Sequence, residues 1–193
     1  MDKLPVYKLV IDDSKEESGV SAIAFVTQPA VMLDWQAFNE QPKQQFAIVS
    51  EEKRLVSGAA MVADLPIYRR SPSGDEYYVI FDKQTIEQIR NKFSRLNLFN
   101  STNEQHTNIT MDGVYMVESY LTDEARGVKA PNGYPNITDG SWITTYKIDN
   151  PTVWEKVKSG EFRGFSIEGY FDQVLLDEKP MSELDKIAED IVR

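Results

Sequence analysis

The chain has 193 residues, no cysteine and one histidine, and its 31 acidic and 21 basic side chains give a formal net charge of −10 at pH 7. This composition excludes disulfides, thiolate catalysis and zinc sites built from thiolates or several imidazoles, and it argues against nucleic-acid binding, because phosphate contacts require clustered Lys and Arg. No apolar run approaches the roughly 20 residues that cross a bilayer, so we expect a soluble, intracellular protein that binds other proteins and has no membrane contact, metal or cofactor.

Eight short segments rich in β-branched or aromatic residues predict strands. They lie at 6–11, 20–27, 46–50, 54–62, 76–81, 114–121, 141–148 and 164–175. Several of them alternate apolar and polar residues, which favours antiparallel sheets over a doubly wound parallel sheet. The predicted fold class is therefore α+β, mainly antiparallel β with a barrel-like closure and two or three flanking helices.

Three segments predict helices. Asp82 can cap the first helix, and Asn150-Pro151 opens a second helix that ends at Gly160. Ser182 and Asp185 resemble a capping box for a third helix at the end of the chain. The first helix has an apolar stripe at one-face spacing, made of Ile86, Ile89, Phe93 and Leu96.

The remaining segments predict loops within one domain. The stretches 97–110 and 123–139 are rich in Asn, Thr, Ser, Gly or Pro, which is typical of long loops. No internal repeat and no convincing domain boundary is present. We expect one domain over residues 1–175, in which strands from 5–50 pack on a core formed by 51–175, followed by a helical tail at 176–193.

Ser166 and His106 are the candidate catalytic pair. A serine hydroxyl becomes a useful nucleophile when a neighbouring base takes its proton, and His106 is the only imidazole in the chain. The run 163–171 (RGFSIEGYF) predicts a strand with Ser166 and Glu168 on one face. Glu168 stands where the nucleophile elbow of α/β-hydrolases requires glycine, so that motif is excluded. Without a contact between them, Ser166 is an ordinary strand residue and His106 an ordinary loop residue.

Several runs of the sequence resemble the XkdF-like prohead proteases of tailed phages. The similarity covers most of residues 19–171, and its most specific part is the block GFSIEG at 164–169. The other matching runs are GVSAI at 19–23, PAV at 29–31, LVSGAAMV at 55–62, IYR at 67–69, YYVIF at 77–81, VES at 117–119, GSW at 140–142 and VWEKVKSG at 153–160.

The resemblance implies a serine endopeptidase related in fold to herpesvirus assemblin. Such an enzyme would trim the phage scaffolding protein and the major capsid protein inside the procapsid, in the bacterial host cytoplasm, and it could also cleave itself. Ser166 would be the nucleophile and His106 the general base, in a protease domain over residues 1–175. A homo-oligomeric state is left open.

The resemblance leaves the third catalytic residue open. Assemblin-type enzymes orient the base with a second histidine, which this chain lacks, so a carboxylate or no residue takes that role. We expect Glu118, with Glu168 as the other candidate. A two-residue turn at Asp112-Gly113 would place Ser119 opposite His106 and turn Glu118 away, and a one-residue bulge would bring Glu118 back.

The alternative function is a catalytically inactive protein with the protease fold that binds capsid-assembly or scaffold partners through its surface. The polar surroundings of His106 and the missing second histidine motivate this alternative. Labelling of Ser166 or His106 by an active-site-directed reagent would distinguish the two functions.

Overall fold

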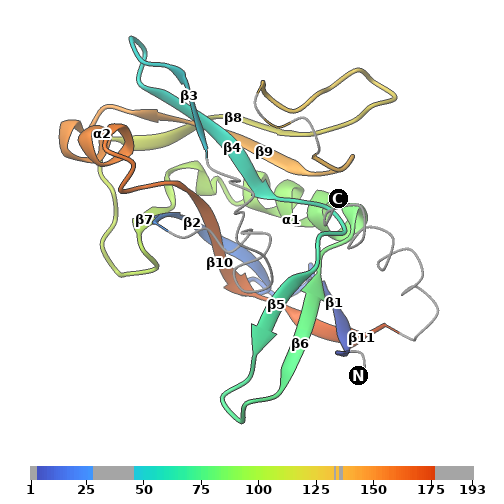
Figure 1. Cartoon of the computed structure of the whole chain (residues 1–193). Coiled ribbons are helices and arrows are strands. Elements are labelled where there is room, and N and C mark those ends of the chain that lie inside the picture. The colour runs from blue at the N-terminus through green and yellow to red at the C-terminus, as the bar shows by residue number, and fades with distance from the viewer. Residues whose placement is uncertain (1–3, 28–45, 133, 135–136, 177–193) are drawn as a thin grey trace.

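The computed structural model describes residues 4–27, 46–132, 134 and 137–176. Within these residues the strands form three separate sheets (Figure 1). The strands are β1 (Val6–Val10), β2 (Gly19–Val26), β3 (Ala47–Ser50), β4 (Leu55–Met61), β5 (Ile67–Arg70), β6 (Glu76–Ile80), β7 (Thr102–Glu104), β8 (Val114–Leu121), β9 (Trp142–Ile148), β10 (Gly164–Tyr170) and β11 (Asp172–Leu175).

The three sheets have the strand orders β11-β1-β6-β5, β10-β2-β7 and β3-β4-β9-β8, and we call them sheets A, B and C. The pairs β1–β6 and β2–β7 are parallel, and the other pairs are antiparallel. The predicted α+β class with mostly antiparallel strands is confirmed. The predicted barrel-like closure is not found, because none of the sheets formed by the described strands closes on itself.

The predicted strands agree with the structure except at three places. The strands β5 and β7 were not predicted, since one is four residues long and the other three. The segment predicted as one strand at 164–175 divides at Phe171 into β10 and β11, which belong to different sheets. The chain therefore leaves sheet B and enters sheet A directly after the block that carries Ser166.

Two helices begin where their capping residues predict, and the second also ends just before the predicted Gly160. Helix α1 (Lys83–Arg95) begins after Asp82, whose carboxylate accepts a 2.8 Å hydrogen bond from the backbone N–H of Thr85. Helix α2 (Pro151–Lys158) begins after Asn150, which accepts hydrogen bonds from the backbone of the first turn. Gly160 follows α2 with a φ of 74°. The third predicted helix, at 182–193, lies outside the described residues.

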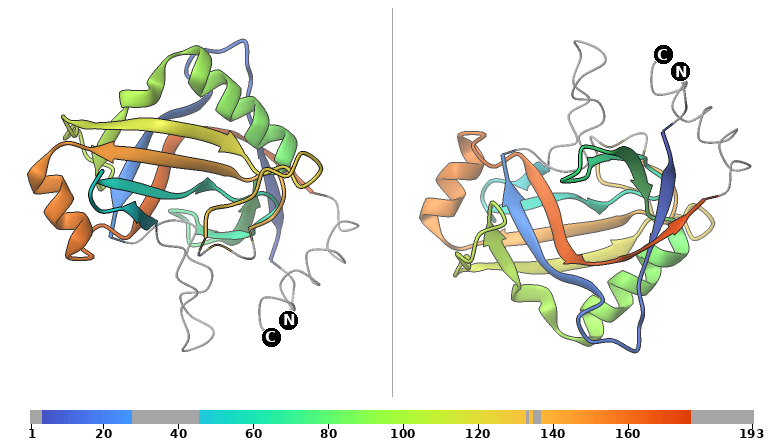
Figure 2. Two further views of the ribbon diagram at one scale, coloured as in Figure 1. Left: turned by 90° about the horizontal axis from the view of Figure 1, so that it is seen from above. Right: turned by 90° about the horizontal axis from the view of Figure 1, so that it is seen from below.

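Helix α1 covers one side of the molecule and contacts both β2 and β9, so it joins sheets B and C (Figure 2). The apolar stripe predicted for this helix faces the core: Ile86, Ile89 and Phe93 are buried, whereas Leu96 is 40% exposed. Helix α2 packs against β9 through Val153, Trp154 and Val157, and no described helix is long and apolar enough to span a membrane.

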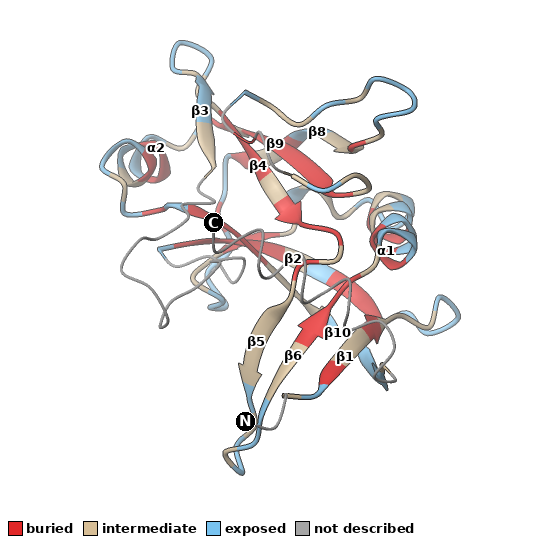
Figure 3. Ribbon diagram, turned by 45° about the vertical axis from the view of Figure 1, so that its right-hand side comes forward, coloured by how far each residue is buried: buried red, intermediate tan, exposed pale blue. Residues whose placement is uncertain are grey.

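The core lies between sheets B and C, where the buried strand segments gather in Figure 3. Phe25 of β2 is at its centre and is fully buried. Its ring contacts those of Tyr146 and Phe165 at centroid distances of 5.3 and 5.0 Å. The other largest buried side chains are Trp142, Phe93 and Phe162. The face of β10 that carries Phe165 is thus packed in the core, and this packing fixes the position of the opposite face, which carries Ser166.

The N-terminal strands pair with strands that come much later in the chain. Strand β1 lies between β6 and β11, and β2 lies between β7 and β10. These pairings place the first described segment beside the last one. The predicted tail at 176–193 lies outside the described residues except for Leu176, so its helical structure stays a prediction.

Candidate active site

Ser166 lies in the middle of β10 and is 4% exposed. The strand register places Ser166 opposite Ala24 and Glu168 opposite Ala22 on β2, and Asn103 of β7 pairs with Ala24 from the other side. Because side chains alternate along a strand, Ser166, Glu168 and the two alanines share one face of sheet B. The small alanines leave space on this face, across which longer side chains from β10 and β7 meet.

His106 lies at the tip of a hairpin that follows β7. The chain reverses between Glu104 and Ile109, where the N–H of Glu104 donates a 3.1 Å hydrogen bond to the carbonyl of Ile109. Gln105 and His106 have φ values of 54° and 57°. Non-glycine residues seldom adopt this left-handed conformation, and those that do gather at functional sites. The reversal presents the only imidazole of the chain to the face that carries Ser166.

An ion pair fixes this hairpin to helix α2. The Glu104 carboxylate contacts the Lys156 ammonium, and both side chains are about three-quarters buried. The hydrogen bond from this ammonium to Glu104 raises the pKa of Lys156, with the nearby negative charges acting in the same direction. Lys156 therefore stays charged, and its ion pair with Glu104 holds the base of the His106 hairpin against helix α2.

Glu168 is the carboxylate that contacts the imidazole. Its Oε1 lies 2.9 Å from His106 Nδ1 and also accepts a 2.7 Å hydrogen bond from Asn103 Nδ2. An ionised carboxylate can only accept, so in the tautomer that this contact favours Nδ1 carries the ring proton and Nε2 is the acceptor nitrogen. The Asn103 amide holds the carboxylate in place from the neighbouring strand.

The structure places Glu118 elsewhere, contrary to the expectation that it contacts His106. The hairpin considered across Asp112-Gly113, which would have set the position of Glu118, does not form, since β8 pairs with β9. The bulge is present between Met116 and Glu118, but it changes the register with β9. Glu118 Oε2 accepts a 2.5 Å hydrogen bond from Thr145 Oγ1. Its contact is therefore within sheet C, and Glu168 is the acidic residue beside the imidazole.

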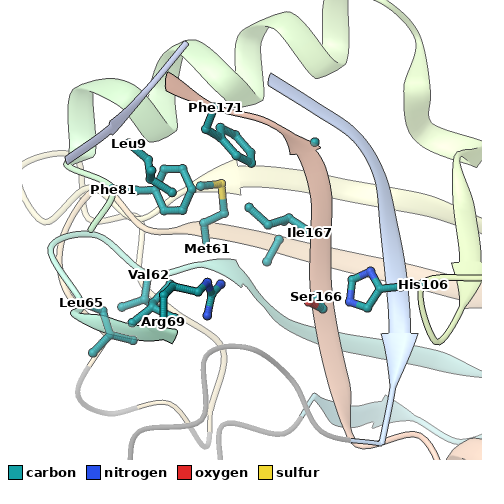
Figure 4. A pocket seen from close by; sticks show the side chains of 13 residues that line it. Leu9, Met61, Val62, Leu65, Arg69, Phe81, His106, Ser166, Ile167 and Phe171 are labelled. Atoms are coloured by element: carbon teal, nitrogen blue, oxygen red, sulfur yellow. The ribbon is translucent and has the colours of Figure 1, made fainter. Parts of the chain in front are cut away.

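Ser166 and His106 line the same pocket, which has a volume of about 370 Å³. In Figure 4 the imidazole of His106 lies beside Ser166 at one end of the pocket, and the apolar side chains lie at the other. The apolar lining comes from Leu9, Ala60, Met61, Val62, Leu65, Ile67, Phe81, Ile167 and Phe171, and Arg69 and Gly169 complete the wall. The pair thus faces a concave, mainly apolar site of a size typical for ligands.

No hydrogen bond joins the Ser166 hydroxyl to His106 or to any other side chain in the described part of the chain. Catalytic hydrogen bonds are often long in an uncomplexed enzyme and shorten when substrate binds. The arrangement of hydroxyl, imidazole and carboxylate along one face can pass a proton from the hydroxyl to the ring, with the carboxylate facing the other ring nitrogen.

Two residues of this site were not predicted from the sequence. Asn103 lies in a polar stretch that predicts a loop, and its role depends on the short strand β7, which a three-residue run does not reveal. Arg69 reaches the pocket because it alternates with Ile67 on β5. That alternation is visible in the sequence, but it gains meaning only when β5 is placed beside the pocket.

A family model described as "putative phage serine protease XkdF" matches residues 44–174. No curated protein and no solved structure matches the chain. The matched region covers more than half of the chain and includes the His106 hairpin and all of β10. The chain therefore belongs to the XkdF family of phage serine proteases, as its resemblance predicted.

Proposed function

We propose that this phage protease is a prohead maturation endopeptidase in which Ser166 is the nucleophile, His106 the general base and Glu168 the residue that orients the base. One observation carries the proposal. The only histidine of the chain contacts a carboxylate through Nδ1 and lines the same pocket as the buried serine. Family membership supports the protease activity, and the geometry supports these roles.

The proposed reaction follows from the positions of these groups. His106 Nε2 takes the proton of the Ser166 hydroxyl as Oγ attacks the scissile carbonyl, and Glu168 stabilises the imidazolium that forms. The imidazolium then donates its proton to the leaving amine, which leaves an acyl-enzyme. Water, deprotonated by the same ring, attacks the ester and regenerates the serine. Asn103 is a positioning residue, because it acts on the ring only through Glu168.

The proposed substrates are the scaffolding protein and the major capsid protein, which the enzyme would cut inside the procapsid in the host cytoplasm, and it could also cleave itself. A relationship to the assemblin fold is part of this proposal. The acidic charge of −10 supports protein substrates over nucleic acid, since a phosphate backbone would be repelled.

The test is co-expression of the chain with its cognate scaffolding and capsid proteins, followed by mass spectrometry of the products. Ser166→Ala should abolish the cleavage products while its thermal unfolding stays close to that of the wild type. Ser159→Ala is the matched control, because Ser159 is exposed after α2 and its hydroxyl contacts only the carbonyl of Lys156 among the described residues. Cleavage by Ser166→Ala at the wild-type rate contradicts the assignment.

The same experiment addresses the inactive assembly protein. If the wild type cleaves none of these proteins but binds them, and a fluorophosphonate leaves Ser166 unlabelled, the non-catalytic function replaces the one proposed. Labelling of Ser166 in the wild type and its absence in His106→Ala would support the proton transfer between the two residues.

A further inference from the structure

Arg69 is an unusual residue in the wall of the pocket. It comes from β5, the edge strand of sheet A, where it shares a face with Ile67. Tyr68, on the other face, donates its hydroxyl to Glu76. Figure 4 shows the Arg69 side chain extended into the pocket in the direction of β10. The alternation of the strand therefore directs one guanidinium group to the site that Ser166 lines.

No described carboxylate pairs with this guanidinium. Among the described residues that line the pocket, Arg69 alone carries a permanent charge. Its Nη1 donates a 3.0 Å hydrogen bond to the carbonyl of Tyr68, and no described carboxylate lies within ion-pair distance. The side chain is half-buried, and burial lowers the pKa of the guanidinium without neutralising it. The remaining donors are therefore directed into a mainly apolar pocket, and none of them donates to a described residue.

A half-buried guanidinium that pairs with no described carboxylate keeps donors for a ligand. A guanidinium presents a planar set of donors that matches the two oxygens of a carboxylate. The apolar wall strengthens such a pair, because it excludes water and lowers the local dielectric constant. The ligand that fits this arrangement is therefore an acidic group on an otherwise apolar or extended chain.

We infer that the pocket is a specificity site in which Arg69 binds an Asp or Glu side chain of the protein substrate close to the bond that Ser166 attacks. This inference rests on the proposed protease function and names the substrate class that the site selects. The acidic side chain enters the pocket, its carboxylate pairs with the guanidinium, and its methylene groups contact the apolar wall.

The test is a library of internally quenched peptides in which Glu, Gln, Leu or Lys occupies each position on both sides of the scissile bond. The wild type should cleave the Glu peptide at one position roughly 10- to 100-fold faster in kcat/KM than the Gln peptide, as expected for a hydrogen-bonded charge. Arg69→Gln should remove this preference, and Arg69→Glu should shift the preference at the same position to Lys.

Arg70→Gln is the matched control. Arg70 is the next residue of β5, is exposed, and contacts the carbonyl of Gly74 outside the pocket, so the preference for Glu should stay. Arg69→Lys keeps the charge without the planar donors and should retain part of the preference. Circular dichroism of each variant shows whether it folds. If Arg69→Gln does not fold, the preference of the wild type for Glu over Gln peptides still tests the inference.

The possible results separate the two proposals. A wild type that cleaves peptides with no preference for an acidic residue overturns the specificity inference and leaves the protease function intact. The same holds if Arg69→Gln keeps the wild-type preference. A wild type that cleaves no peptide and no cognate protein overturns the proposed function, and the specificity inference falls with it.

Discussion

At the residue scale, the candidate site depends on two residues of one strand and one residue of a hairpin tip. Ser166 and Glu168 lie two positions apart on the same face of β10, a separation of about 7 Å. One imidazole ring with a hydrogen bond on each nitrogen can bridge such a gap. His106 already contacts Glu168 through Nδ1 and lines the same pocket as Ser166, so Nε2 is the ring nitrogen that remains for the Ser166 hydroxyl.

Glu168→Gln should lower kcat by about 10²- to 10⁴-fold with little change in KM, because the carboxylate no longer stabilises the imidazolium in the transition state. Steady-state kinetics with a cleaved peptide measure the effect. Glu118→Gln is the matched control and should stay close to the wild-type kcat, since Glu118 contacts Thr145 in sheet C. A large loss in Glu118→Gln together with normal activity in Glu168→Gln would make Glu118 the third catalytic residue.

At the element scale, the start of α1 ties the helix to sheet A. Asp82 caps the helix by accepting from Thr85 N, and its other carboxylate oxygen pairs with Lys8 of β1. Burial acts to raise the pKa of Asp82, but the hydrogen bonds from Lys8 and Thr85 outweigh it and hold the pKa below 3.8. Because the folded state depresses this pKa, the pair stabilises the fold above pH 3.8 and loses its effect as the pH falls through the folded value.

Asp82→Ala should lower the free energy of unfolding at neutral pH by about 1 kcal/mol for the lost cap, with a further loss from the unpaired Lys8. Asp82→Asn keeps a capping side chain and should lose less. Urea denaturation at neutral pH and below pH 3.8 measures both effects. The wild type should lose more stability on acidification than Asp82→Asn, and equal losses in the two proteins would show that this carboxylate does not contribute.

At the scale of the whole molecule, one aromatic cluster holds sheets B and C together. Phe25 of β2 contacts Tyr146 of sheet C and Phe165 of β10, so the strand that carries Ser166 is fixed by the same core that joins the sheets. The pocket in turn takes side chains from sheets A, B and C. The site therefore exists only when all three sheets are assembled.

Phe25→Ala should destabilise the protein by about 3 to 5 kcal/mol, because a large cavity would form in this core. Such a loss is a large part of the roughly 5 to 15 kcal/mol that stabilises a folded domain, so the thermal transition should move to a lower temperature and activity should be lost with it. Calorimetry and peptide cleavage at increasing temperature measure both. Val174→Ala, at a position 49% exposed on β11, should change stability by less than about 0.5 kcal/mol. A similar small effect for Phe25→Ala would contradict the role of this core.

Local sequence determined the two helix starts, the longer strands and the candidate catalytic pair. Asp82 and Asn150 predicted the starts of both described helices, because a capping side chain acts on the backbone beside it. The alternation around Ser166 predicted that Ser166 and Glu168 share a face, since the period of a strand is a local property. The uniqueness of His106 limited the base to one residue, and matching runs along the chain indicated the family.

Tertiary structure alone decided which residues meet. The sequence favoured Glu118 over Glu168, but the contact to His106 is made by Glu168, because β8 pairs with β9 and the small alanines of β2 leave space on the face of β10. Asn103 and Arg69 joined the site through the short strands β7 and β5, whose length gives almost no local signal. Strand pairing between distant segments depends on the packing of the whole core, so a local sequence pattern cannot predict which strands pair.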